Sequence, residues 1–242
     1  MAHGSLRPIK ISFDSLAGVD GSARFSFGDT CTALASVSGP IAARPASEHP
    51  ARATVEVHVR PLSSVPGTAE KLLGSAFKGI IESACLLGQH PRTLIQVVVQ
   101  ALSQPSSALV AAKINACSLA LVNAGSIPMR GVVCAVVVGL RTDGNKTEFI
   151  LDPEDETRLD GTFCFALLFG IISGSFQGKI PPSEVVWMNS RTYKGTSISL
   201  DTHKFKLATE LARTGATEVW LRMRESLGGF PSTADGEEEM EV

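Results

Sequence analysis

The residues best suited to chemistry are carboxylates that gather in one short segment. Asp152, Glu154, Asp155 and Glu156 follow a hydrophobic, strand-like stretch, and Asp160 comes soon after them. Carboxylate oxygens are the ligands that Mg²⁺ prefers, and a carboxyl group can also act as a general acid or base. One hypothesis is therefore a Mg²⁺ site in this segment. The alternative, which we favour, is a solvated turn that follows a strand.

Histidine and cysteine offer little for catalysis or metal binding. His58 and His90 have no partner at the spacing of a metal site or a catalytic triad. The sequence contains neither a serine nucleophile elbow nor a P-loop. The five cysteines include no C-x-x-C pair, so we expect packed free thiols and predict no metal and no cofactor. Their odd number and the lack of a signal peptide favour a reducing compartment. The cysteines are Cys31, Cys85, Cys117, Cys134 and Cys164.

The composition is that of an ordinary globular protein. The chain has 242 residues, which is enough for one domain with a sizeable core. Its formal net charge of -2 argues against a dedicated, free-standing nucleic-acid binder, because such proteins are usually basic. Any contact with RNA must then come from a local patch or a shared surface. No uninterrupted apolar run is long enough to span a bilayer, so we expect no membrane.

Alternating hydrophobic and polar residues predict several β-strands. Residues 21–27 and 31–38 lie on either side of the turn Gly28-Asp29-Thr30, which predicts a β-hairpin. Residues 53–59 alternate small hydrophobic side chains with polar ones and predict a strand with one buried face. Further strand-like stretches follow at residues 93–101, 132–140, 148–151, 162–168 and 185–189.

Three stretches have hydrophobic residues at helical spacing. Residues 68–84 form an amphipathic stripe, which Thr68 is placed to cap. Residues 108–123 are apolar nearly all round, which is typical of a buried helix, and Gly125 is placed to end it. Residues 201–227 form the last amphipathic stripe.

The order of these elements predicts one α+β domain of packed sheets and helices. No linker divides it, and we place the domain at residues 12–227. Residues 1–11 carry no pattern and are predicted to be a disordered tail. Residues 228–242 are polar and acidic and are predicted to be a second disordered tail.

Five short motifs, all in register, resemble those of RNase PH-like proteins. The first resembles the G-D-T…G-P signature of that family, the second its P-R-T strand start, and the third its N-A-…-A-L-x-D-A-G helix. Two shorter stretches follow in the expected order, and the resemblance covers residues 15–227. The motifs are Gly28-Asp29-Thr30 with Ser38-Gly39-Pro40, Gly88–Thr93, Ile114–Gly125, Ile127-Pro128-Met129, and Leu151-Asp152-Pro153.

Within this family, residues 62–71 and 222–227 are most similar to a ring subunit of the eukaryotic RNA exosome that takes part in ribosomal-RNA processing. The resemblance implies a single RNase PH-like domain of the ribosomal protein S5 domain 2-like class. It implies a heterodimer with another RNase PH-like subunit in a six-membered ring, S1/KH cap subunits, and a hydrolytic exonuclease that receives single-stranded RNA through the ring. It also implies a location in the nucleus, the nucleolus and the cytoplasm.

The resemblance further implies where an RNase PH active site would lie. Such enzymes hold phosphate with arginines, whose forked donors match an oxyanion. Ser75 falls on the first arginine of their helix element and Lys78 on the second. Leu109 falls on the arginine of their phosphate loop and cannot bind an anion. Glu156 falls on the first acidic position. Thr162 falls on the second, and a slip of one or two residues in the register would place Asp160 there instead.

We therefore predict a non-catalytic ring subunit with no catalytic residue of its own. Lys78, Arg92 and Lys113 are candidates to line the RNA path, although a structural salt bridge is the favoured role for each. Lys113, in the apolar helix, either faces the pore or snorkels from a partly buried position. Two alternatives stay open: a stand-alone phosphorolytic or metal-dependent 3'-5' exoribonuclease that uses Glu156 and Asp160, and a nucleic-acid-binding homodimer.

Overall fold

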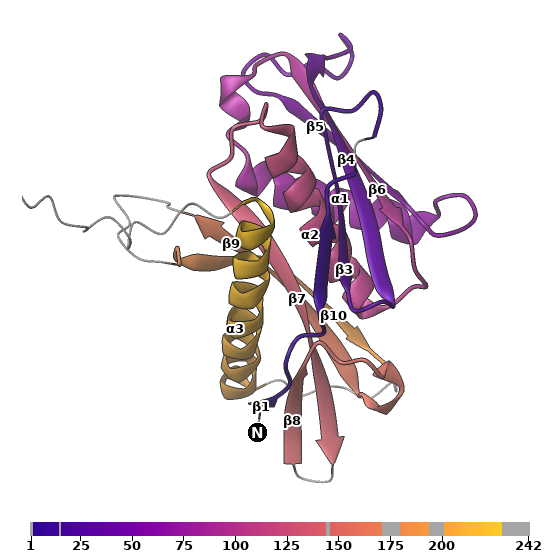
Figure 1. Ribbon diagram of the computed structural model, residues 1–242, viewed down its shortest axis with the longest axis vertical. Coiled ribbons are helices and arrows are strands. Elements are labelled where there is room, and N and C mark those ends of the chain that lie inside the picture. The colour runs from indigo at the N-terminus through magenta and orange to yellow at the C-terminus, as the bar shows by residue number, and fades with distance from the viewer. Residues whose placement is uncertain (1, 15, 144–145, 171–179, 194–200, 229–242) are drawn as a thin grey trace, which may run out of the picture.

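The computed structural model describes residues 2–14, 16–143, 146–170, 180–193 and 201–228. These residues form two five-stranded sheets and three α-helices (Figure 1), which confirms the α+β prediction. Sheet A has the order β1-β8-β7-β9-β10, and sheet B has the order β2-β3-β4-β6-β5. In sheet A the strands are β1 (Ala2–His3), β8 (Lys146–Leu151), β7 (Gly131–Asp143), β9 (Gly161–Gly170) and β10 (Ser183–Thr192); in sheet B they are β2 (Ile9–Ser12), β3 (Gly21–Phe27), β4 (Cys31–Ala42), β6 (Thr93–Ala101) and β5 (Thr54–Arg60).

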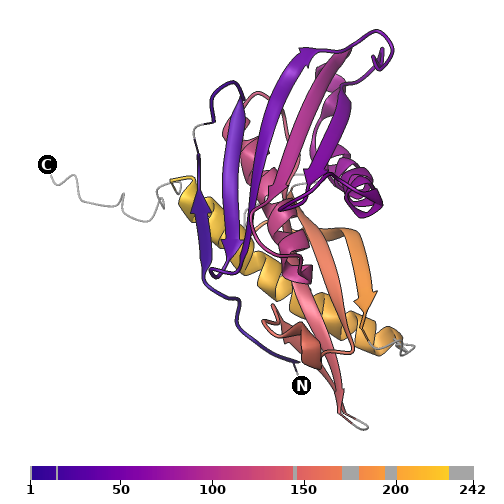
Figure 2. The ribbon, with the colours of Figure 1, turned by 90° about the vertical axis from the view of Figure 1, so that its right-hand side faces the viewer.

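The helices separate and cover the two sheets. Helix α2 (Ser107–Ala124) packs against β3 and β4 of sheet B and against β7 of sheet A. Helix α1 (Thr68–Ala84) lies at the β5 edge of sheet B, as Figure 2 shows, and α3 (Thr202–Ser226) packs on β7 and β9. Figure 1 shows α3 at one side, sheet B at the other, and α2 between them.

The position of α2 explains why its sequence is apolar all round. By length and composition this helix could cross a membrane, but 78% of it is buried inside the protein, so it is the central core helix. Two of its polar residues, Asn115 and Ser118, have a specific task. Strand β8 pairs with β7 only from Val138 onward, so the first half of β7 has no strand on that side. Asn115 makes two hydrogen bonds to the backbone of Ala135, and Ser118 donates to the carbonyl of Val133.

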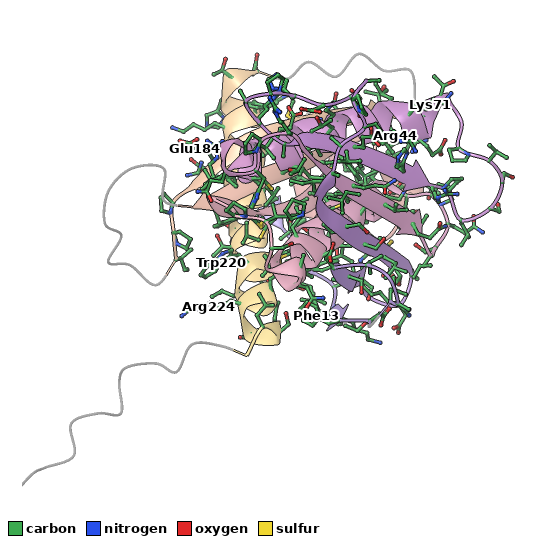
Figure 3. The ribbon with its side chains drawn as sticks, turned by 90° about the horizontal axis from the view of Figure 1, so that it is seen from above. Phe13, Arg44, Lys71, Glu184, Trp220 and Arg224 are labelled. Carbon is green, nitrogen blue, oxygen red and sulfur yellow. The ribbon has the colours of Figure 1, made fainter. Side chains whose placement is uncertain are left out.

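Helix α3 is fixed to sheet A by an aromatic contact. Trp220 stacks on Phe169 of β9, with ring centroids 6.1 Å apart. Arg224, one turn further along the helix, places its guanidinium 5.6 Å from the centroid of the Trp220 ring (Figure 3). A basic residue is expected on the solvent-exposed side of a helix. Arg224 also covers an apolar ring.

The amino-terminal segment differs from the prediction. Residues 1–11 were expected to be a disordered tail, but β1 pairs with β8 in sheet A and β2 pairs with β3 in sheet B. Leu6, between the two short strands, is buried. Strands this short have too few residues to show a periodic pattern in the sequence. Their stability comes from pairing with strands far away in the sequence. Of the predicted acidic tail 228–242, residues 229–242 lie outside the described part of the chain.

Most of the predicted elements are confirmed, with small changes at their ends. The hairpin of β3 and β4 is present, and Gly28 in its turn has φ of +59°, a conformation that favours glycine. Helix α2 ends at Gly125, which adopts the left-handed conformation as expected. Thr68, however, is the first residue of α1 and not its cap. Gly67 precedes the helix, and its N–H donates to the Glu70 carboxylate.

Candidate active-site remnant at the amino end of α2

The amino end of α2 carries the backbone N–H groups that a phosphate would need. The first N–H groups of any helix have no partner within it, and the helix dipole favours an anion there. Ser106 caps the helix by accepting a hydrogen bond from the N–H of Leu109 at 3.1 Å. The N–H of Ser107 donates to Oε1 of Glu156 at 2.7 Å. A carboxylate of the chain itself therefore occupies this end of the helix.

The same carboxylate belongs to a closed group of polar side chains, which we call the amino-end cluster: Ser107, Glu156, Thr162 and Tyr193. The hydroxyl of Tyr193 donates to Oε2 of Glu156 at 2.6 Å. The Ser107 hydroxyl lies 2.8 Å from the Thr162 hydroxyl and 2.8 Å from that of Tyr193. Ser107 and Thr162 are only 7% and 2% exposed, whereas Glu156 and Tyr193 are partly exposed, so the cluster is buried on the side of α2 and β9. Burial, and then the hydrogen bond to Glu156, raise the pKa of Tyr193 above its ordinary value.

The resemblance predicts phosphate-binding arginines at the positions of Ser75 and Leu109. These two residues bring no positive charge to the cluster. Leu109 is 3% exposed and belongs to the hydrophobic core. Ser75 lies on the exposed side of α1. Both residues stand where the resemblance led us to expect phosphate ligands, and neither side chain has a charge with which to hold one.

Lys113 lies one turn beyond Leu109 on α2 and is 5% exposed. Burial lowers the pKa of its amine, and the negative charge of Glu70 on α1 partly offsets that effect. A lysine this deeply buried does not present its charge to RNA. Of the two roles left open for it, the partly buried position is closer to what the structure shows.

The other two predicted RNA contacts are both on the surface. Lys78 is exposed on α1. Arg92 is exposed, but it precedes β6, whereas α2 begins beyond the opposite end of that strand. At a rise of about 3.3 Å per residue, the two ends of β6 are roughly 26 Å apart. Arg92 therefore lies away from the amino end of α2, and it forms an ion pair with Glu48 at 3.3 Å, which is the kind of role favoured for it from the sequence.

The acidic segment does not converge on a metal site. Asp152 is buried and turns toward Arg7, whose Nε and Nη2 lie 2.8 and 2.6 Å from its two oxygens. Asp155 caps the short 3-10 helix Glu156–Arg158 by accepting from Thr157, which lowers the pKa of Asp155. Within the described ranges, no three His, Cys, Asp or Glu side chains are grouped to hold a metal ion.

Asp160 contacts the cluster through its backbone, since its carbonyl accepts the N–H of Tyr193 at 2.9 Å. Its carboxylate accepts from the backbone N–H of Thr142 at 2.6 Å. Thr162, by contrast, shares the cluster with Glu156. The geometry therefore favours Thr162 over Asp160 as the residue that stands at the second acidic position.

Two residues of this region escaped sequence analysis. Tyr193 follows β10 and contacts Glu156. The one sequence feature that could have drawn attention to it is that it is the only tyrosine of the chain. Arg7 lies in the segment that was predicted to be disordered, and no local pattern connects it with Asp152. Both contacts join parts of the chain that only the folded sheets bring together.

Comparisons with known proteins agree with this fold. The model of the 3' exoribonuclease family, domain 1 (RNase PH), matches residues 5–126. The described architecture has the same fold as solved exosome subunits, as detailed below. The chain therefore belongs to the RNase PH family, and the predicted RNase PH-like fold is confirmed.

The similar proteins include subunits of eukaryotic and archaeal exosomes. The exosome complex component rrp46 of Schizosaccharomyces pombe is 32% identical over 223 residues, which cover 92% of this chain and 91% of that protein. The crystal structure of rice (Oryza sativa) Rrp46 matches with a TM-score of 0.75 and 28% identity, covering 93% of this chain and 96% of the other. A chain of the Archaeoglobus fulgidus exosome, solved with RNA bound to the active site, has a TM-score of 0.65 at 20% identity, covering 92% and 89%, and supports the shared fold alone.

Proposed function

We propose that this protein is a non-catalytic structural subunit of the RNA exosome core ring. Its function would be to help form the channel through which RNA passes to a separate 3'-5' exonuclease, in ribosomal-RNA processing and RNA degradation. Membership of the ring is supported by the similarity to the fission yeast exosome component over 92% of this chain. We further propose that the protein forms a heterodimer with another RNase PH-like subunit in this ring, which S1/KH subunits cap. Its proposed location is the nucleus, the nucleolus and the cytoplasm.

The absence of catalysis rests on one observation at the amino end of α2. The N–H of Ser107 already donates to the Glu156 carboxylate, and Leu109 is buried where a cationic side chain would be needed. A phosphate approaching this point would meet a negative charge and no arginine from either position. Phosphorolysis needs bound phosphate as its nucleophile, so this arrangement removes the binding site for that co-substrate.

A direct assay tests the catalytic part of this proposal. Purified protein is incubated with single-stranded RNA, Mg²⁺ and inorganic phosphate, and nucleoside diphosphates are measured. We expect none above a protein-free blank, and the same result for Glu156→Gln. Phosphate-dependent trimming that Glu156→Gln abolishes would show instead a phosphorolytic exoribonuclease.

A second experiment tests the ring. The full-length chain is recovered from its native source, and native mass spectrometry identifies what accompanies it. We expect other RNase PH-like chains, S1/KH-type subunits and a hydrolytic exonuclease. A lone homodimer that binds RNA at moderate salt would contradict this expectation. In the assembled ring, we propose Lys78 as an RNA-path residue, because its side chain is exposed on α1.

A further inference from the structure

Both oxygens of the Glu156 carboxylate are held by groups from distant parts of the chain. Oε1 accepts the backbone N–H of Ser107, in the first turn of α2, at 2.7 Å. Oε2 accepts the hydroxyl of Tyr193, just beyond β10, at 2.6 Å. Glu156 itself begins the 3-10 helix that follows β8. One side chain thus connects the start of the core helix, the segment after β8 and the end of an edge strand.

The phenol of Tyr193 is positioned for this contact by its backbone. The N–H of Tyr193 donates to the carbonyl of Asp160 at 2.9 Å, which continues the pairing of β10 with β9 by one residue. The ring is covered on one side by the Arg191 guanidinium, 5.5 Å from its centroid. Among the described residues, the charged groups with a recorded contact to the phenol are Glu156 and Arg191, while α2 and β9 contribute the hydroxyls of Ser107 and Thr162.

We propose that Glu156 is a resident anion: its carboxylate replaces an external phosphate at the amino end of α2 and, through Tyr193, fastens the end of β10 to that helix. The start of a helix attracts an anion whether the anion is free or belongs to the chain. A tethered carboxylate has the advantage, because it loses less freedom on binding than a free ion does. Glu156 already accepts the N–H of Ser107, so an external phosphate would have to displace its carboxylate to reach that N–H. The inference does not depend on assembly into a ring.

Tyr193 gives a direct optical test, because it is the only tyrosine of the chain. Its ionisation is followed by the tyrosinate absorbance as the pH is raised. In the wild-type protein the pKa of Tyr193 is raised, so its midpoint lies above the ordinary value of about 10. In Glu156→Gln, the charge that opposes tyrosinate is gone, and we expect the midpoint to fall toward the ordinary value. Glu154→Gln is the matched control, since Glu154 is exposed, and it should titrate as the wild type does.

The sign of the linked effect on stability follows from the same contact. A raised pKa means that the folded state favours the protonated phenol. The contribution is fully present below the unfolded-state pKa of about 10 and is lost as the pH rises through the folded-state value. The wild type should therefore lose stability in alkaline solution more steeply than Glu156→Gln. Identical Tyr193 midpoints in these two proteins would overturn the proposal.

Two further measurements keep the proposal testable if Glu156→Gln does not fold. In Tyr193→Phe, Glu156 loses one of its two anchors, so the amide of Ser107 should exchange its hydrogen faster than in the wild type. Unchanged exchange would contradict a fastening role. The wild-type protein should also melt at the same temperature in inorganic phosphate as in chloride of matched ionic strength. Stabilisation specific to phosphate would show that the site still takes an external anion and would also overturn the proposal.

Discussion

The ion pair of Arg7 with Asp152 gives the most precise prediction about stability. It joins the amino-terminal segment to the end of β8, and the side chains are only 14% and 2% exposed. Asp152 accepts three hydrogen bonds from Arg7, including one from its backbone N–H at 3.0 Å. The perturbation is Asp152→Asn. Asp152 has φ of +47°, a conformation that asparagine adopts readily, so the substitution removes charge without adding backbone strain.

The expected magnitude follows from the burial of the pair. Removing one partner of a buried ion pair costs about 3–5 kcal/mol, because the other charge is left without compensation. Arg7 keeps some access to water, so the lower end, about 3 kcal/mol, applies. For a chain of this length, that corresponds to a fall in Tm of roughly 6–12 °C. The assay is thermal and urea unfolding followed by circular dichroism.

The control comes from an exposed ion pair on the same segment. Lys10 pairs with Asp29, and their side chains are 64% and 85% exposed. Asp29→Asn should change the stability by less than about 1 kcal/mol. If Asp152→Asn destabilises no more than Asp29→Asn does, the reasoning from burial is refuted. A double-mutant cycle with Arg7→Met should in addition give a clear coupling energy between the two residues.

Four other predictions concern packing and burial. Gly21→Ala should destabilise the protein by about 1–3 kcal/mol in urea unfolding, because the added Cβ would meet the backbone of α2. The control Gly79→Ala, on the open side of α1, should be neutral or stabilising by up to about 1 kcal/mol. Equal effects of the two substitutions would contradict this prediction. Leu109→Ala should cost about 2–5 kcal/mol in the same assay, since the residue is part of the core, and a loss below about 1 kcal/mol would show that its side chain is not packed. Lys113→Met should raise the Tm at neutral pH, because burial lowers the pKa of this lysine and charging it in the folded state is unfavourable; a lower Tm would mean that the amine has a stabilising partner. The five cysteines, all free and buried, should react with a thiol reagent only after unfolding, and rapid labelling of the native protein would refute their burial.

Burial also explains why the thiols of Cys85, Cys117, Cys134 and Cys164 should stay inert in mild alkali. It raises the pKa of Cys85, Cys117 and Cys164 to about 12, so the reactive thiolate is scarce well above neutral pH. The sequence had placed all five cysteines in apolar surroundings, and the structure confirms that interpretation. The prediction succeeded because a cysteine within a regular hydrophobic element inherits the burial of that element.

The elements with strong local patterns were predictable, and the polar contacts between them were not. The periodicity of α1 and the apolar surface of α2 identify both helices, and the hairpin follows from the alternation around Gly28. The pairing of Arg7 with Asp152 spans 145 residues, and that of Ser107 with Glu156 spans 49. No periodic pattern encodes such contacts, because they depend on the register of the sheets and on how α2 lies between them.

By itself, the sequence determined the family through its motifs. It also determined that Leu109 and Ser75 cannot carry a charge in any fold, because the residue type at a position is already its chemistry. Only the tertiary structure decided what became of the remaining polar groups. It buried Lys113, paired Arg92 with Glu48, and turned Asp152 and Glu156 in different directions. The physical reason is that a carboxylate takes whichever donors the packed elements bring within hydrogen-bonding distance, and for Glu156 these are the start of α2 and the only tyrosine of the chain.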